Sequence, residues 1–145
     1  MNILVSACLL GVNCKYNQEN NHCPEVIELM KDHHLIPICP EIMGGLPTPR
    51  EAAEIVGDRV FSKSGIDVTE YFQKGAMEVL KLAECYQCTH AVLKERSPSC
   101  GNGQVYDGTF TKTLRSGDGI TVQLLKKHGI VVLGESKDYG EILWN

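Results

Sequence analysis

Three cysteines of this chain are placed where they could hold a metal ion or an iron–sulfur cluster. Cys8 and Cys39 stand at the ends of two predicted β-strands, and Cys100 follows a third by a few residues. In an open parallel α/β sheet the carboxyl ends of the strands share one edge, and ligands bind there. Three thiolates at that edge would leave a coordination position open for chemistry. Each cysteine alone is more simply a small buried side chain. Because each adjoins a long loop, we favour the site.

The other four cysteines are weaker candidates. The total of seven is odd, which excludes a fully paired disulfide framework within one chain. Cys85 and Cys88 have the C-x₂-C spacing of a zinc site but lack a second pair, and we expect them at the opposite edge of the sheet. Cys14, six residues after Cys8, could be a fourth ligand, a spare thiol or a core residue. For Cys23, at a helix start, we expect capping or packing.

Polar side chains in the same loops could act beside such a centre. Glu41 follows Cys39 across Pro40, which stiffens the link, so its carboxylate could serve as a general acid or base. Ser97 and Ser99 come just before the third cysteine and could donate hydrogen bonds to a substrate. The alternatives are a solvated glutamate and ordinary Ser-Pro turn chemistry.

Three further residues could bind a flat, polar ligand. Arg50 could place its planar guanidinium against such a ligand, or simply form a surface ion pair. Tyr16 and Tyr106 could stack on a planar base, as aromatic side chains do with nucleobases.

The elements that must position these residues follow an α/β pattern. Apolar runs predict strands, and helical spacing or capping signals predict helices. The strands are expected at 2–7, 35–39, 91–93 and 130–133, a hairpin at 54–63, and helices from Pro24, from Asp67 to about Cys85, and from Ile120 to Gly129.

Three long loops follow the predicted strands, at 8–22, 40–50 and 94–109. Three prolines and a Gly-Gly pair argue against any helix in 40–50. We therefore expect an α/β fold in one compact domain, 1–145. It would have a mainly parallel, Rossmann-like sheet flanked by helices, a small hairpin, and long loops at the strand carboxyl ends.

Length, net charge and hydropathy indicate which kinds of partner the protein has. A length of 145 residues fits one domain, and the net charge of −4 gives no strong nucleic-acid signal. No apolar run approaches the ~20 residues that span a bilayer, and the N-terminus lacks the features of a signal peptide. We therefore expect a cytoplasmic protein with no membrane association.

Several motifs together resemble the TudS-like family of thiouracil desulfidases, bacterial domain-of-unknown-function family 523. The resemblance covers nearly the whole chain in the family's order. Asn17 stands where that family usually has aspartate, and Gln18 follows it in place of glycine. The matching stretches are Ser6-Ala7-Cys8-Leu9-Leu10-Gly11, Cys14-Lys15-Tyr16, Cys39-Pro40-Glu41, Gly44-Gly45-Leu46-Pro47-Thr48-Pro49-Arg50, Leu93-Lys94-Glu95-Arg96-Ser97-Pro98-Ser99-Cys100-Gly101 and Tyr106-Asp107-Gly108-Thr109-Phe110.

The resemblance implies an enzyme that hydrolyses a thiocarbonyl carbon–sulfur bond without net electron transfer. It implies a [4Fe-4S] cluster held by Cys8, Cys39 and Cys100, with the fourth iron open to the sulfur of a thiolated base or nucleoside. Thiouracil would become uracil, and the sulfur would leave as hydrogen sulfide. The family's proposed catalytic residues fall on Glu41 and Ser97.

Two other functions remain open from the sequence. One is an iron–sulfur binding or sulfur-carrier protein without hydrolysis, and the other is a zinc-bound structural module. Neither the physiological substrate nor the oligomeric state is determined by the sequence.

Overall fold

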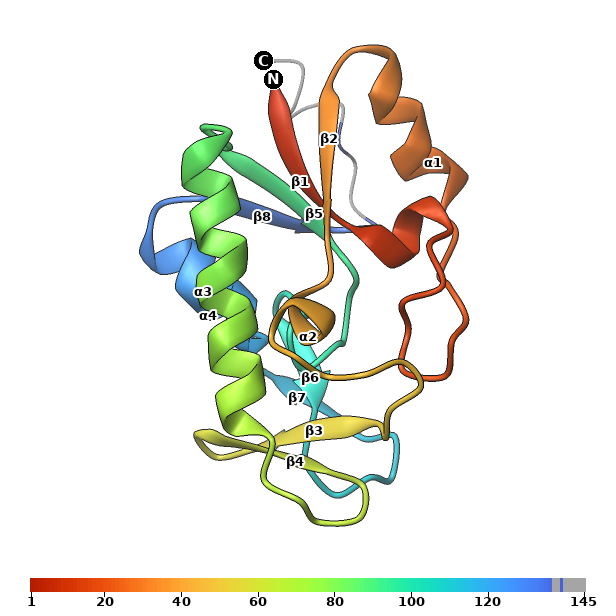
Figure 1. Ribbon diagram of the computed structural model, residues 1–145, viewed down its shortest axis with the longest axis vertical. Coiled ribbons are helices and arrows are strands. Elements are labelled where there is room, and N and C mark those ends of the chain that lie inside the picture. The colour runs from red at the N-terminus through yellow and green to blue at the C-terminus, as the bar shows by residue number, and fades with distance from the viewer. Residues whose placement is uncertain (137–138, 140–145) are drawn as a thin grey trace.

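A computed structural model describes residues 1–136 and 139; the single domain expected over 1–145 therefore extends to residues outside the described ones. Its centre is a four-stranded sheet in the order β2-β1-β5-β8, with every neighbouring pair parallel (Figure 1). The predicted α/β fold with a parallel sheet is confirmed. The strands are β1 (Asn2–Ser6), β2 (His34–Ile38), β5 (His90–Leu93) and β8 (Val131–Gly134).

Helices cover both faces of this sheet. Alternate residues of a strand point to opposite faces, so Leu4 packs with α3 and α4, while Ile3 and Val5 pack against the segment that contains α1. Figure 1 shows α3 and α4 together on one side and α1 on the other. The covering elements are α3 (Thr69–Cys85), α4 (Ile120–Lys127), α1 (Pro24–Ile27), and the short 3₁₀ helices η1 (Ala7–Leu10) and η2 (Glu28–Lys31).

Helix α3 is the longest element, and one of its faces is apolar and buried. Phe72, Ala76, Val79 and Ala83 are buried on it. Asp67 holds the first turn, because its Oδ1 accepts hydrogen bonds from the Thr69 backbone N–H at 3.0 Å and from the Thr69 hydroxyl at 2.6 Å.

Two small antiparallel pairs lie beyond the main sheet. The predicted hairpin is confirmed as β3 (Ala53–Val56) and β4 (Arg59–Ser62). The prediction that 94–109 is loop throughout is wrong, since β6 (Gln104–Tyr106) pairs there with β7 (Leu114–Ser116). A separate hydrophobic cluster joins both pairs to α3. Its buried residues are Ile55, Val60, Val68, Phe72 and Val105.

The expectation of no helix in 40–50 is also wrong. Helix α2 (Pro40–Met43) makes one turn directly after β2. Proline fits the first helical position, where its missing N–H needs no partner, and Gly44 follows the end of the turn. The Gly-Gly pair and the other prolines come after the helix and do not interrupt it.

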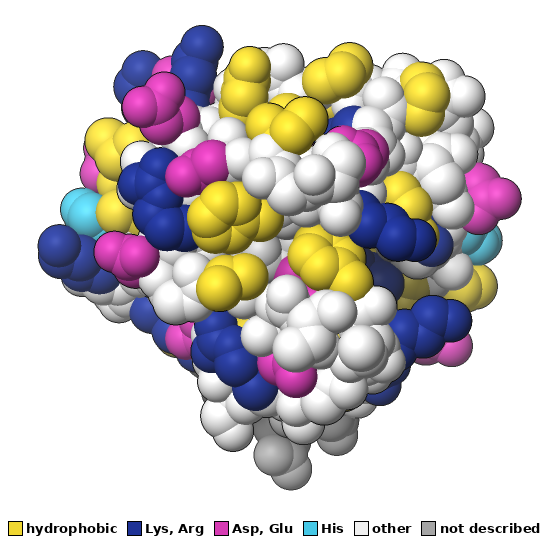
Figure 2. Space-filling model, turned by 90° about the horizontal axis from the view of Figure 1, so that it is seen from below, with side chains coloured by type: hydrophobic (Ala, Val, Ile, Leu, Met, Phe, Trp, Pro, Cys, Tyr) yellow, Lys and Arg dark blue, Asp and Glu magenta, His cyan; other side chains and the backbone are white. Residues whose placement is uncertain are grey.

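At the hairpin end, the described residues present a mixed surface. Figure 2, seen from below, shows hydrophobic side chains in several small groups separated by charged ones. Among the described residues, no helix is both long enough and apolar enough to cross a membrane.

Candidate active site

A cavity of about 480 Å³ lies at the carboxyl edge of the sheet. Cys8 reaches it from η1, just after β1, and Cys39 from the junction of β2 and α2. Cys100 lines it from the loop after β5. The parallel sheet thus brings the three predicted thiols from distant parts of the chain to one cavity, because β1, β2 and β5 are neighbours that end at the same edge.

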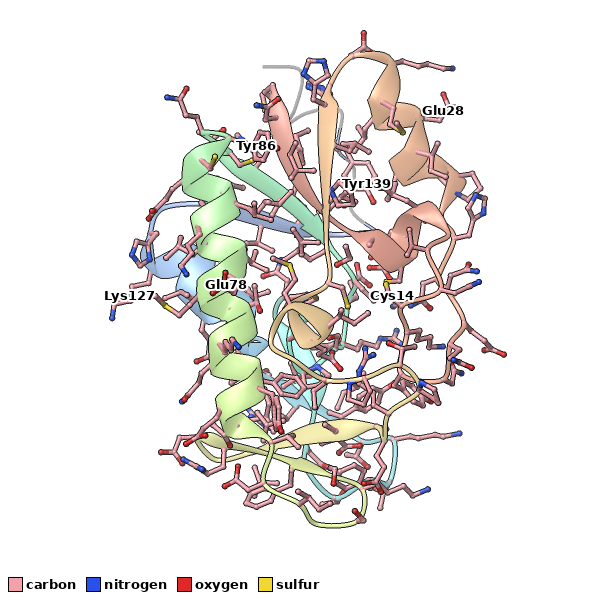
Figure 3. The ribbon with its side chains drawn as sticks, viewed as in Figure 1. Cys14, Glu28, Glu78, Tyr86, Lys127 and Tyr139 are labelled. Carbon is pink, nitrogen blue, oxygen red and sulfur yellow. The ribbon has the colours of Figure 1, made fainter. Side chains whose placement is uncertain are left out.

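Cys14 lies among these thiols. It is buried, with a side chain within hydrogen-bonding reach of Cys8 and Cys39 (labelled in Figure 3). Hydrogen bonding from Cys14 lowers the pKa of Cys8 to about 7 and that of Cys39 to about 7, while the pKa of Cys14 itself is raised. Cys8 and Cys39 therefore lose their protons most readily and form thiolates, the form that binds metals.

The remaining cysteines differ sharply in their surroundings. Burial raises the pKa of Cys100 to about 12, although Ser6 and Ser99 offset part of that effect by hydrogen bonding. Cys88 is buried in the cluster between the sheet and α3, whereas Cys85 is exposed at the end of α3. Neither of the last two lines the cavity.

The donors that line the cavity include the thiols of Cys8, Cys14, Cys39 and Cys100. Cysteine thiolates are the usual protein ligands of iron–sulfur clusters. Among residues 1–136 and 139, no three His, Cys, Asp or Glu side chains gather closely enough to hold one metal ion.

Glu41 lies at the centre of a hydrogen-bonded group in the same cavity. Its Oε1 accepts a hydrogen bond from Nε of Arg50 at 3.0 Å, and its Oε2 accepts one from the Ser99 hydroxyl at 2.8 Å. Glu41 lies in the first turn of α2, and Cys39 immediately precedes that helix. A carboxylate beside three thiols is suitably placed for proton transfer to a ligand in the cavity.

The two serines have different surroundings. Ser99 is buried, with 1% of its surface exposed, and Ser97 is half-buried on the cavity wall. The Ser97 Oγ accepts the backbone N–H groups of Ser99 and Cys100, each at 3.1 Å. The two hydroxyls lie 2.9 Å apart. Since the Ser99 hydrogen is directed to Glu41, Ser97 donates to Ser99, and the three side chains form a continuous chain of hydrogen bonds.

The two tyrosines line the cavity on different segments. Tyr16 is 40% exposed and lies in the loop after η1, and Tyr106 is half-buried at the end of β6. Both are available to a planar ligand that enters the cavity.

Sequence reasoning missed one wall of the cavity. Phe110 and Lys112 line it from a loop in which both have positive φ, of 58° and 60°. Glu54 of β3 holds this loop, because its Oε1 accepts the backbone N–H groups of Gly108 at 3.0 Å and Phe110 at 3.1 Å. No sequence signal linked Glu54 to a segment more than fifty residues later.

Cationic side chains that the sequence reading left aside also reach the cavity. They outnumber the carboxylates of the lining, Glu41, Glu54 and Glu95, although Lys94 is already paired with Glu135 at 2.6 Å. These side chains are Lys15, Lys63, Lys94, Arg96 and Lys112.

Comparison with known proteins shows which family the chain belongs to. The profile of the 2-thiouracil desulfurase family matches residues 3–137. The chain belongs to this enzyme family. The cavity described above is therefore that of a 2-thiouracil desulfurase family member. The resemblance to thiouracil desulfidases found in the sequence is confirmed.

Two relatives of this 2-thiouracil desulfurase family member are similar over nearly their whole length. The solved structure of the [4Fe-4S]-dependent thiouracil desulfidase TudS has a TM-score of 0.88 and 42% sequence identity, with 92% of this chain and 90% of that chain covered. The Bacillus subtilis (strain 168) uncharacterized protein YbbK is 39% identical over 145 residues, with 93% of this chain and 96% of YbbK covered.

Proposed function

We propose that this protein removes sulfur from thiolated pyrimidine bases, with water replacing the thiocarbonyl sulfur and hydrogen sulfide as the second product. The observation that carries the proposal is the Glu41 carboxylate, bonded to Ser99 at 2.8 Å, in the same cavity as Cys8, Cys39 and Cys100. The family and the [4Fe-4S] dependence of TudS support it. A thiolated base or nucleoside is the proposed substrate class.

In this proposal, Cys8, Cys39 and Cys100 hold a [4Fe-4S] cluster. Their thiol groups occupy one cavity, and the pKa values of Cys8 and Cys39, lowered to about 7 by hydrogen bonding from Cys14, favour the thiolate form. When bound, a cluster with three protein ligands supplies an open iron that acts as a Lewis acid toward the thiocarbonyl sulfur.

The remaining chemistry is assigned to residues of the chain. Glu41 removes a proton from the attacking water and returns one to the departing sulfur. Ser97 orients the ring by turning its hydroxyl hydrogen from Ser99 to the bound base, and Tyr16 and Tyr106 pack on the flat faces of the ring. The overall reaction is thiocarbonyl plus water giving carbonyl plus hydrogen sulfide. It balances with no oxidant or reductant.

The test is anaerobic reconstitution with iron and sulfide, followed by assay of sulfide release from 2-thiouracil, 4-thiouracil and thiouridines. The wild-type protein is expected to release sulfide and form the oxygenated base, and Glu41→Gln is expected to keep its iron but lose about 10²–10⁴-fold in rate. An iron-loaded wild-type protein that turns over none of these compounds would refute the enzyme proposal and favour a carrier of sulfide. Full activity in Glu41→Gln would refute the role given to Glu41.

A further inference from the structure

We propose that Arg50 is a positioning residue for this reaction, which fixes the Glu41 carboxylate without contacting the substrate. The inference rests on the proposed function, because Glu41 is the acid–base group there. Arg50 ends the loop that follows α2, nine residues after Glu41, and its side chain is 6% exposed.

Every nitrogen of the Arg50 guanidinium already has an acceptor within the protein. Nε donates to Oε1 of Glu41 at 3.0 Å, and Nη2 donates to the backbone carbonyl of Cys14 at 2.9 Å. Nη1 donates to the Thr48 hydroxyl at 2.9 Å. A buried guanidinium engaged in three directions holds its own orientation, and it has no unpartnered nitrogen to present to a ligand.

The Glu41 carboxylate is held from two opposite sides as a result. Arg50 binds Oε1 and Ser99 binds Oε2, so rotation about the last side-chain bond would break both hydrogen bonds. The two donors belong to different segments, one after α2 and the other after β5. The plane of the carboxylate is therefore fixed relative to the sheet edge before a substrate enters.

Arg50 also ties this carboxylate to the loop that follows η1. Its backbone N–H donates to the carbonyl of Tyr16 at 2.8 Å, while its side chain binds the Cys14 carbonyl. The distance between the acid–base group and the wall that carries Tyr16 is thereby set by one residue. Lysine could supply the charge but not three hydrogen bonds in fixed directions.

The kinetic test compares Arg50→Met, Arg50→Lys, Glu41→Gln and the double variant Arg50→Met/Glu41→Gln, each checked for iron content and visible absorbance. Arg50→Met is expected to lower kcat by about 100-fold, with KM within about twofold of wild type. The kcat of Arg50→Lys is expected to lie between those of wild type and Arg50→Met. In the Glu41→Gln background, Arg50→Met is expected to lower kcat no further, because the group that it positions no longer acts.

Losses that add in the double variant, or a KM that rises about tenfold in Arg50→Met, would overturn the inference and make Arg50 a direct substrate ligand. If Arg50→Met fails to fold or to bind iron, Thr48→Val removes the nearer of the two acceptors of Nη1 and leaves the Pro47 carbonyl at 3.4 Å. It is expected to lower kcat severalfold at unchanged KM, and an unchanged kcat would count against the inference.

A crystal structure of Arg50→Met supplies a readout that does not depend on turnover. The Glu41 carboxylate is expected to turn out of reach of the Ser99 hydroxyl, and an unchanged Glu41–Ser99 hydrogen bond would overturn the inference. This result is separable from the proposed function, since a wild-type protein inactive on thiolated bases refutes that function whatever position Glu41 takes.

Discussion

The backbone of Gly75 in α3 lies directly against the carbonyl group of Pro40 in α2. A Cβ atom at Gly75 would fall 1.9 Å from that oxygen, which is backbone and has little freedom to move. The contact is mutual, because a Cβ at Gly44 would fall 1.9 Å from the carbonyl oxygen of Tyr71. Two glycines thus allow the short helix that carries Glu41 to rest on the long helix.

Gly75→Ala is expected to destabilise the protein by about 1–3 kcal/mol, because the added methyl group must push α2 away from α3. Since Cys39 and Glu41 flank Pro40, iron content and turnover should fall as well. Urea denaturation and iron analysis measure the two effects. Lys74→Ala, on the exposed side of the same turn, is the matched control and should stay within about 0.5 kcal/mol of wild type. An unchanged midpoint in Gly75→Ala would contradict the close contact.

Replacement of any proposed cluster ligand should remove the cluster. Cys8→Ser, Cys39→Ser and Cys100→Ser are each expected to lose most of their iron and acid-labile sulfide after anaerobic reconstitution, because serine is a poor replacement for thiolate. Cys85→Ser, at the exposed end of α3, should load like wild type. A fully loaded Cys100→Ser protein would remove that residue from the ligand set.

Cys14→Ser tests whether Cys14 binds the cluster or only lies beside the residues that do. We expect this variant to retain iron, because Cys14 contributes hydrogen bonds to Cys8 and Cys39 and is not one of the three proposed ligands. Stability should change by about 1 kcal/mol, the typical net contribution of one hydrogen bond. Iron loss equal to that of Cys8→Ser would show that Cys14 binds the cluster.

Ser99→Ala removes the hydroxyl that holds Oε2 of Glu41. Turnover of thiouracil is expected to fall about 10- to 100-fold, as the carboxylate loses one of its two fixed partners, while iron content stays normal. Ser116→Ala, on exposed β7 and outside the cavity lining, serves as the control. Equal kcat in Ser99→Ala and Ser116→Ala is the result that would exclude a contribution from this hydrogen bond.

Acid should weaken the start of α3 through Asp67. Its pKa is lowered to about 2 by hydrogen bonding from the Thr69 hydroxyl and backbone N–H and by Arg59. A carboxyl with a depressed pKa stabilises the folded state above its unfolded pKa of about 4, and this contribution is lost as the pH falls from about 4 to 2. Asp67→Asn should therefore lower the Tm at pH 7, with a gap to wild type that narrows through this window. A gap that does not vary with pH would assign the effect to packing.

The sequence predicted the scaffold well because each element had a local cause. Apolar runs predicted the strands, and the shared edge of parallel strands predicted that Cys8, Cys39 and Cys100 would lie together. Helix α2 was missed because the prolines of 40–50 were read together, although Pro40 alone occupies a helical position and suits it.

What the sequence could not predict are contacts between loops. Ser99 and Glu41 are 58 residues apart, and their hydrogen bond depends on how two loops turn after leaving the sheet. The hydrogen bonds of the Arg50 side chain, such as the one to the Cys14 carbonyl, are likewise defined only by tertiary structure. The wall at Phe110 was missed for a related reason, since no glycine marks its positive φ.

The hydrogen bonds from Gly108 and Phe110 to Glu54 give the cavity a second side, which is built from the hairpin end of the molecule. One side is anchored in the parallel sheet and carries the thiols. The other is anchored in the hairpin cluster around Phe72 and Val105, and carries Phe110. Repacking that distant cluster would widen or narrow the opening while leaving the sulfur chemistry intact. We therefore expect substitutions in the hairpin cluster to alter the size of substrate that is accepted more than the rate of the chemical step.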